Sequence, residues 1–171
     1  EELLSVYSSD DFEGRLTGER GDKLAANFLR DFYITNQIEP ALNTIDYFQP
    51  YKLNLPGNMY TRQYTFPEKL RAYDRYAEGD KIVETQNVAS IIKGSVYPDS
   101  YVIITGHLDH VGVDAEIVYN GADDNGSGTV SILEIAQAFK IAVNDGKRPK
   151  RSIVFLHVSG EEEGLLGSEY Y

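Results

Sequence analysis

Two short apolar runs on either side of a helical segment constrain the fold of this chain more than any other feature. Tyr101–Thr105 and Ser152–Val158 are rich in β-branched residues and do not alternate with polar ones, which is typical of strands buried on both faces. Between them, Ser127–Val143 has apolar residues at helical spacing. The residues expected on its inward face are Ile132, Ile135, Ala136, Phe139 and Val143. This order predicts a βαβ unit, and we expect an α/β fold: a three-layer α/β/α sandwich around a mixed, largely parallel sheet.

The remainder of the chain shows weaker patterns. A helix is expected from about Asp22 to Tyr33, a strand over Asn87–Ile92, and another helix starting near Leu165. Gly14–Gly18 is expected to form a loop. Residues 41 to 80 predict strand and loop, and their aromatic residues fit either core packing, which we favour, or a binding surface. Those aromatic residues are Tyr47, Phe48, Tyr51, Tyr60, Tyr64 and Phe66.

Composition narrows the class of protein. The 171 residues fit one domain, and a net charge of -11 argues against nucleic acid as a partner. The chain has no cysteine, which excludes disulfides and thiolate metal sites. No apolar run approaches the roughly 18 residues of a membrane span. The first residues, 1 to 4, do not resemble a signal peptide, so the protein is either cytosolic or carries a targeting segment outside this sequence.

Three polar motifs lie at the expected ends of strands or the start of a helix. His107–His110 follows the first apolar strand, Gly121–Gly126 precedes the helix, and Gly160–Gly164 follows the second apolar strand. In open α/β sheets, ligands bind beyond the carboxyl ends of the strands. The three motifs are therefore candidates for one site.

The chemistry of these residue types favours a metal. A neutral imidazole at His107 is a good zinc ligand, and Asp109 can fix its tautomer, although a structural loop histidine is the alternative. Adjacent aspartates at 123 and 124 form either a solvated turn or helix cap, or a carboxylate bridge between two metals. Glutamates at 161 to 163 follow a buried strand, where charge is costly without a partner. One of them binding a metal beside another acting as general base is a plausible division of roles.

Together these motifs closely resemble the di-zinc aminopeptidase family. That family includes secreted bacterial leucyl aminopeptidases, aminopeptidase Y and, more distantly, glutamate carboxypeptidase. The resemblance rests on 107–110, 121–128 and 159–168, and Glu13–Gly18 resembles the opening segment of the family. It covers roughly residues 8 to 40 and 84 to 171.

The resemblance implies two zinc ions per complete active site and a role for each matching residue. His107 would bind one zinc, Glu162 the other, and Asp124 would bridge both. Glu161 would be the general base, and Asp109 would orient His107. No metal ligand role falls on Asp123, His110 or Glu163. His157, on the second apolar strand, is expected to be a core histidine.

The family has five metal-binding residues, and the sequence ends at Tyr171, before two of them would occur. We therefore expect residues 1–171 to be the N-terminal portion of a single zinc-peptidase catalytic domain whose C-terminal part is missing. Only residues 41 to 83 lie where many relatives carry an inserted domain, so no separate inserted domain is evident.

The resemblance implies an aminopeptidase that cleaves the N-terminal bond of peptides with a water activated by two zinc ions. A carboxypeptidase, a glutaminyl cyclase-like enzyme, or a non-catalytic module without metals remain alternatives on the same scaffold, and the fragment alone would be inactive if two ligands are absent. The habit of the family implies a periplasmic or extracellular location. Side-chain preference and oligomeric state stay open.

Overall fold

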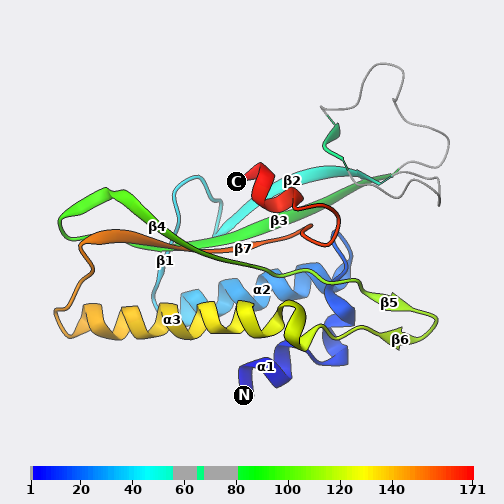
Figure 1. The fold of residues 1–171 in the computed structure, drawn as a ribbon, viewed down its shortest axis with the longest axis horizontal. Helices are drawn as coiled ribbons and strands as arrows, with labels where there is room; N and C mark the ends of the chain where they lie inside the picture. The colour runs from blue at the N-terminus through cyan, green and yellow to red at the C-terminus, as the bar shows by residue number, and fades with distance from the viewer. Residues whose placement is uncertain (1, 56–64, 68–80) are drawn as a thin grey trace.

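A five-stranded sheet lies at the centre of the protein, in the order β1-β3-β7-β4 with β2 also paired to β3. The computed structural model describes residues 2–55, 65–67 and 81–171. Figure 1 shows α1, α2 and α3 on one face of the sheet and α4 on the other. The helices are α1 Glu2–Tyr7, α2 Arg20–Thr35, α3 Ser127–Asn144 and α4 Leu166–Tyr170. The strands are β1 Glu39–Pro40, β2 Phe48–Leu55, β3 Lys81–Ile92, β4 Tyr97–His107, β5 Val113–Asp114, β6 Ile117–Val118 and β7 Arg151–Val158.

The pairing of β4 with β7 confirms the expected βαβ unit. The two strands are parallel, with His107 opposite Val158, and α3 connects them. Both strands therefore end at the same edge of the sheet.

The sheet is mixed, as expected, but the expectation that it is largely parallel is wrong for the described residues. Strands β1, β2 and β7 all pair antiparallel with β3, which leaves β4–β7 as the parallel pair within the described part of the chain. An uninterrupted apolar strand indicates burial on both faces. It does not report the direction of its neighbours, and that is the information the sequence lacked.

The two apolar strands differ in burial. Strand β7 is buried from Ser152 to Val158, as expected. In β4, Tyr101, Val102 and Ile103 are exposed, which corrects the expectation of a buried strand. Within the described residues β4 is an edge strand with β7 as its neighbour, so its apolar side chains are not covered on both faces.

The main core lies between the sheet and the helices α2 and α3. Helix α2 extends beyond the expected Asp22–Tyr33 at both ends and buries Ala25, Leu29 and Tyr33. In α3 the inward face is formed by Thr129, Val130, Ile132, Leu133 and Ala136, with Phe139 and Val143 packed beside the core. Ile135 was expected on that face but is 38% exposed. It lies about 100° around the helix from Ala136, outside the stripe that starts at Thr129.

The N-terminal segment packs against the loop that follows β4. Residues Asp10–Arg15 form a 3-10 turn with left-handed backbone at Glu13 and Gly14, so the expected loop begins only after Arg15. A Cβ at Gly14 would lie 2.2 Å from the carbonyl oxygen of Gly112, so this close approach requires glycine. The segment is thereby brought beside His107–His110.

Among the aromatic residues of the region 41 to 80, Tyr47, Tyr51 and Phe66 are buried, as core packing predicts. Tyr60 and Tyr64 lie outside the described residues. No helix in the described part of the chain is long and apolar enough to cross a lipid bilayer.

Candidate metal centre

His107 is the last residue of β4, and its buried ring is held in one tautomer. Its Nδ1 lies 3.1 Å from the backbone oxygen of Asp109. A carbonyl oxygen only accepts, so Nδ1 carries a proton. The Thr129 hydroxyl also donates to the His107 carbonyl oxygen, at 2.7 Å. The other ring nitrogen, Nε2, therefore faces the site.

Asp124 lies opposite this nitrogen, in the turn Ala122–Gly126 that precedes α3. Its Oδ1 is 3.0 Å from His107 Nε2, and the Asp124 side chain is 69% exposed. A neutral imidazole with its proton on Nδ1 offers a lone pair at Nε2, and a carboxylate oxygen also only accepts. Two such atoms at this distance require a cation between them, either a proton or a metal ion.

Glu161 and Glu162 form the turn after β7 and are held by Asp109. The buried Asp109 carboxylate accepts hydrogen bonds from the backbone amides of Glu161 and Glu162, at 3.2 and 3.3 Å, and from the Thr17 hydroxyl at 3.0 Å. Burial raises the pKa of Asp109, while the amide of Glu161 and then His107 counteract this shift. The Asp109 carboxylate is 3.8 Å from His107 Nδ1, too far for a hydrogen bond. His107 is therefore oriented by the backbone carbonyl of Asp109 and not, as expected, by its side chain.

A second buried network fixes Ser159, just before this turn. The Ser159 hydroxyl donates to Asp22 Oδ1 at 2.8 Å, and its amide donates to Asn87 Oδ1 at 3.1 Å. Asp22 also accepts from the Thr85 hydroxyl at 2.7 Å. Burial raises the pKa of Asp22 to about 7, although the hydrogen bonds from Thr85 and Ser159 oppose the shift.

Arg15 joins the loop after β4 to the loop before α3. Its side chain is 1% exposed, and its guanidinium donates to the carbonyl oxygens of Leu108 at 3.0 Å, Asn120 at 2.8 Å and Gly121 at 3.0 Å. A fourth bond of 3.1 Å reaches the carbonyl oxygen of Tyr7. Burial lowers the pKa of Arg15. One side chain thus fixes the backbone on both sides of the His107–Asp124 pair.

The structure brings all five residues predicted from the sequence into one site. Ligand atoms of His107, Glu161 and Glu162 lie within 4.8 Å of one another, and so do those of His110, Asp124 and Glu162. Sequence reasoning missed Arg15, Thr17 and Asp22 as parts of this site, and placed His110 beside the ligands without a role. Arg15 and Thr17 lie in the segment that resembles the family, but no local pattern tells which loops they would contact.

This set of donor atoms fits zinc. Imidazole nitrogen and carboxylate oxygens are common zinc ligands. Two ligands of one tetrahedral zinc ion, with bonds of about 2.0–2.2 Å, lie roughly 3.3 Å apart, and the 3.0 Å between His107 Nε2 and Asp124 Oδ1 is close to that separation.

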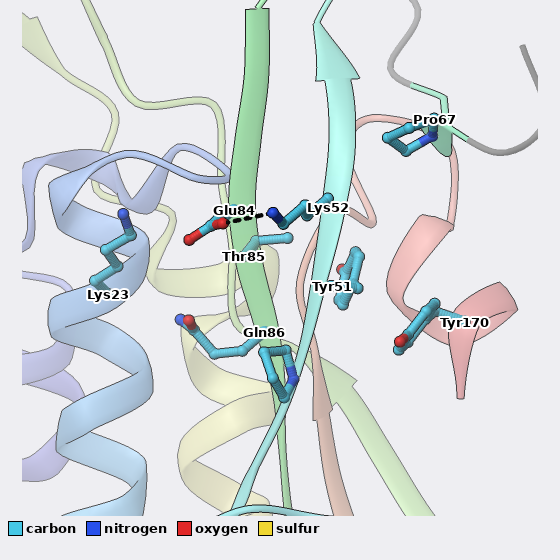
Figure 2. A pocket seen from close by; sticks show the side chains of 9 residues that line it. Lys23, Tyr51, Lys52, Pro67, Glu84, Thr85, Gln86 and Tyr170 are labelled. Carbon is cyan, nitrogen blue, oxygen red and sulfur yellow. Dashed lines mark ion pairs between the residues drawn. The ribbon is translucent and has the colours of Figure 1, made fainter.

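A groove of ≈ 530 Å³ adjoins the turn that carries the glutamates. Figure 2 shows Tyr51 beside Tyr170 and the ion pair between Lys52 and Glu84 in its wall. Tyr51 donates to the carbonyl oxygen of Ser159 at 2.7 Å, so one wall of the groove is hydrogen-bonded to the segment just before Glu161 and Glu162. The lining residues are Lys23, Pro50, Tyr51, Lys52, Pro67, Glu84, Thr85, Gln86 and Tyr170.

Comparison with protein families identifies the second half of the chain. Residues 87–171, which contain all five candidate residues, match peptidase family M28. The chain belongs to this peptidase family. Within it, the chain is 38% identical over 93 residues to the probable glutamate carboxypeptidase VP8 of Zea mays and 38% identical over 101 residues to aminopeptidase NAALADL1 of Rattus norvegicus. These matches cover 54% and 58% of the M28 chain, which spans 12% of the length of either relative.

Solved structures share the fold of this M28 chain. The aminopeptidase from Aneurinibacillus sp. strain AM-1 superposes with a TM-score of 0.70 at 13% identity, covering 99% of this chain and 64% of that one. The zinc aminopeptidase of Bacillus subtilis gives a TM-score of 0.66 at 16% identity, covering 99% and 63%. A glutaminyl cyclase of Fimbriiglobus ruber gives 0.62 at 14% identity, covering 95% and 44%. The fold alone therefore does not decide the reaction.

Proposed function

We propose that this chain is the metal-binding portion of a zinc exopeptidase that removes N-terminal residues from peptides. The observation that carries the proposal is the pair of acceptor atoms, His107 Nε2 and Asp124 Oδ1, 3.0 Å apart at the edge of the sheet. His107, Asp124 and Glu162 would hold zinc. When bound there, zinc supplies a Lewis acid and an acidic water molecule.

Glu161 acts as the general base in this proposal. Its Oε2 is 3.8 Å from His107 Nε2, and its side chain is 35% exposed, so it reaches the site while remaining open to substrate. The Asp109 carboxylate fixes the backbone amide of Glu161 at 3.2 Å. Glu161 takes a proton from the attacking water and gives it to the leaving amine.

Two metal ions are proposed because the ligand atoms fall into two overlapping groups. Glu162 belongs to both groups, one with His107 and Glu161 and the other with His110 and Asp124. Within these groups His107, Asp124 and Glu162 would be the metal ligands, whereas Glu161 and His110 lie beside them without binding a metal. Asp124 would lie between the two ions, since it contacts His107 and also belongs to the second group.

The charge of the site favours a substrate with a free amine. Asp123 is exposed beside the site and has no proposed metal role, and opposite charges attract most strongly in a partly desolvated site. The α-ammonium group of a peptide provides the opposite charge.

The decisive experiment uses the complete protein and a pair of peptides, one with a free and one with an acetylated N-terminus. We expect cleavage of the free peptide alone, with zinc content retained and turnover lost in Glu161→Gln. The matched control is Glu163→Gln, which should keep activity. Substantial turnover by Glu161→Gln would refute the role of Glu161.

Two other reactions are outcomes of the same assay. Release of the C-terminal residue from both peptides would identify a carboxypeptidase, and cyclisation of an N-terminal glutamine without cleavage would identify a glutaminyl cyclase-like enzyme. Either result would contradict the aminopeptidase proposal. We also propose a periplasmic or extracellular location, which cell fractionation tests.

A further inference from the structure

His110 lies beside Glu162 although the two residues are 52 positions apart in the chain. His110 Nδ1 is 2.6 Å from Glu162 Oε1, and both side chains are largely buried. The backbone amide of His110 donates to the Arg15 carbonyl oxygen at 3.1 Å. Its ring lies on Gly121, where an added Cβ would come within 2.5 Å of Cδ2. The position of the ring is therefore fixed by its surroundings.

The distance between these atoms separates two possible roles for His110. Two ligands of one tetrahedral zinc ion lie roughly 3.3 Å apart, whereas hydrogen bonds with one charged partner are short, about 2.7–2.9 Å between nitrogen and oxygen. The 2.6 Å between His110 and Glu162 fits a hydrogen bond and is too short for a shared metal ion. The 3.0 Å between His107 and Asp124 is nearer to the separation of two zinc ligands, and a neutral His107 ring with its proton on Nδ1 has no proton on Nε2 to donate to Asp124.

We propose that His110 is a positioning residue for Glu162: its Nδ1–H donates to Oε1, which leaves Oε2 to bind zinc. This inference rests on the proposed function. A carboxylate held at one oxygen cannot exchange its two oxygens by rotation, so Glu162 presents a single ligand atom in a fixed direction. Partners of this kind that orient metal ligands typically change metal affinity about 10–100-fold when they are removed.

Three substitutions separate a positioning role from a ligand role. Asn places an amide N–H near the position of Nδ1 in His, whereas Gln places it near Nε2, and Ala removes the donor. We would measure the zinc dissociation constant of His110→Asn, His110→Gln and His110→Ala in the complete protein by competition with a chromophoric chelator. Far-UV circular dichroism would check that each variant is folded, and the visible spectrum of the cobalt-loaded chain would report a change of ligands.

Zinc binding about 10–100-fold weaker in the Ala and Gln variants, with the Asn variant close to the wild-type chain and an unchanged cobalt spectrum, would support the proposal. An Asn variant as weak as the Ala variant, with an altered cobalt spectrum, would show that His110 is a ligand and overturn it. Unchanged affinity in His110→Ala would overturn it as well. If the complete wild-type protein and its His107→Ala variant both fail to bind zinc, the proposed function itself fails. That result is distinct from a complete protein that binds zinc regardless of His110.

Discussion

Replacing Arg15 with Met should strongly destabilise the protein, because the guanidinium donates to four carbonyl groups, two in buried and two in partly buried hydrogen bonds. The carbonyl of Leu108 would keep the Tyr7 hydroxyl as a donor, at 3.0 Å, and that of Gly121 would keep the Gly126 amide, also at 3.0 Å. The carbonyls of Tyr7 and Asn120 would lose their Arg15 donor. At about 1–3 kcal/mol for each buried carbonyl left without a partner, the loss is about 2–6 kcal/mol.

Part of this loss is offset, since Met carries no charge that must be buried. A net destabilisation of about 2–4 kcal/mol is expected, which lowers the melting temperature of a chain this long by roughly 5–15 °C. Urea and thermal denaturation of Arg15→Met measure it. The control is Arg20→Met, at an exposed arginine paired with Glu13, where a change within about 0.5 kcal/mol is expected. If the unfolding free energy of Arg15→Met falls within 0.5 kcal/mol of that of the control, by the same criterion, the central role of Arg15 is refuted.

Three further predictions concern the site and its surroundings. Asp109→Asn removes an acceptor for the amides of Glu161 and Glu162 and should weaken zinc binding about 10–100-fold, measured by chelator competition; unchanged affinity would argue against this positioning. Gly121→Ala places a Cβ 2.5 Å from the carbonyl oxygen of Asp124 at a φ of +51°, and should weaken zinc binding while Gly146→Ala, in open space, does not. Burial lowers the pKa of His157 to about 3. Below about pH 6.5 His157 is therefore protonated in the unfolded chain and neutral in the folded chain, so the stability of the fold decreases as the pH is lowered. Between pH 7 and pH 5 the unfolding free energy should drop by about 2 kcal/mol because of His157. Urea denaturation should show that this drop is absent in His157→Gln, and an equal pH dependence in the two proteins would contradict the prediction.

The elements predicted correctly from the sequence are those whose apolar residues are spaced as their buried positions require. Helix α3 and strand β7 occur where their apolar spacing placed them, because each is covered by the same core. Strand β4 shows the limit of this reasoning. Its apolar run has the same character as that of β7, yet its side chains are exposed, because coverage depends on neighbouring chain and not on the strand itself.

The candidate metal ligands could be predicted from the sequence, but the residues that hold the surrounding loops in place could not. His107, Asp124, Glu161 and Glu162 follow from motifs at element ends, where glycine and acidic residues are unusual enough to be noticed. The contacts of Arg15 with Leu108 and Asn120 span 93 and 105 residues. Such hydrogen bonds depend on tertiary packing. The sequence alone does not show whether an arginine is buried or exposed.

The central claim, that the carboxylate of Asp124 and the ring of His107 share a zinc ion, is tested most directly by the zinc-binding isotherm of two neighbouring variants. Asp123 and Asp124 lie side by side in one turn, and only Asp124 contacts His107 among the described residues of that pair. Asp123→Asn should bind zinc like the wild-type chain, and Asp124→Asn should bind it at least about tenfold more weakly. Measured in the complete protein, equal affinities in the two variants, or a wild type that binds no zinc, would contradict the claim.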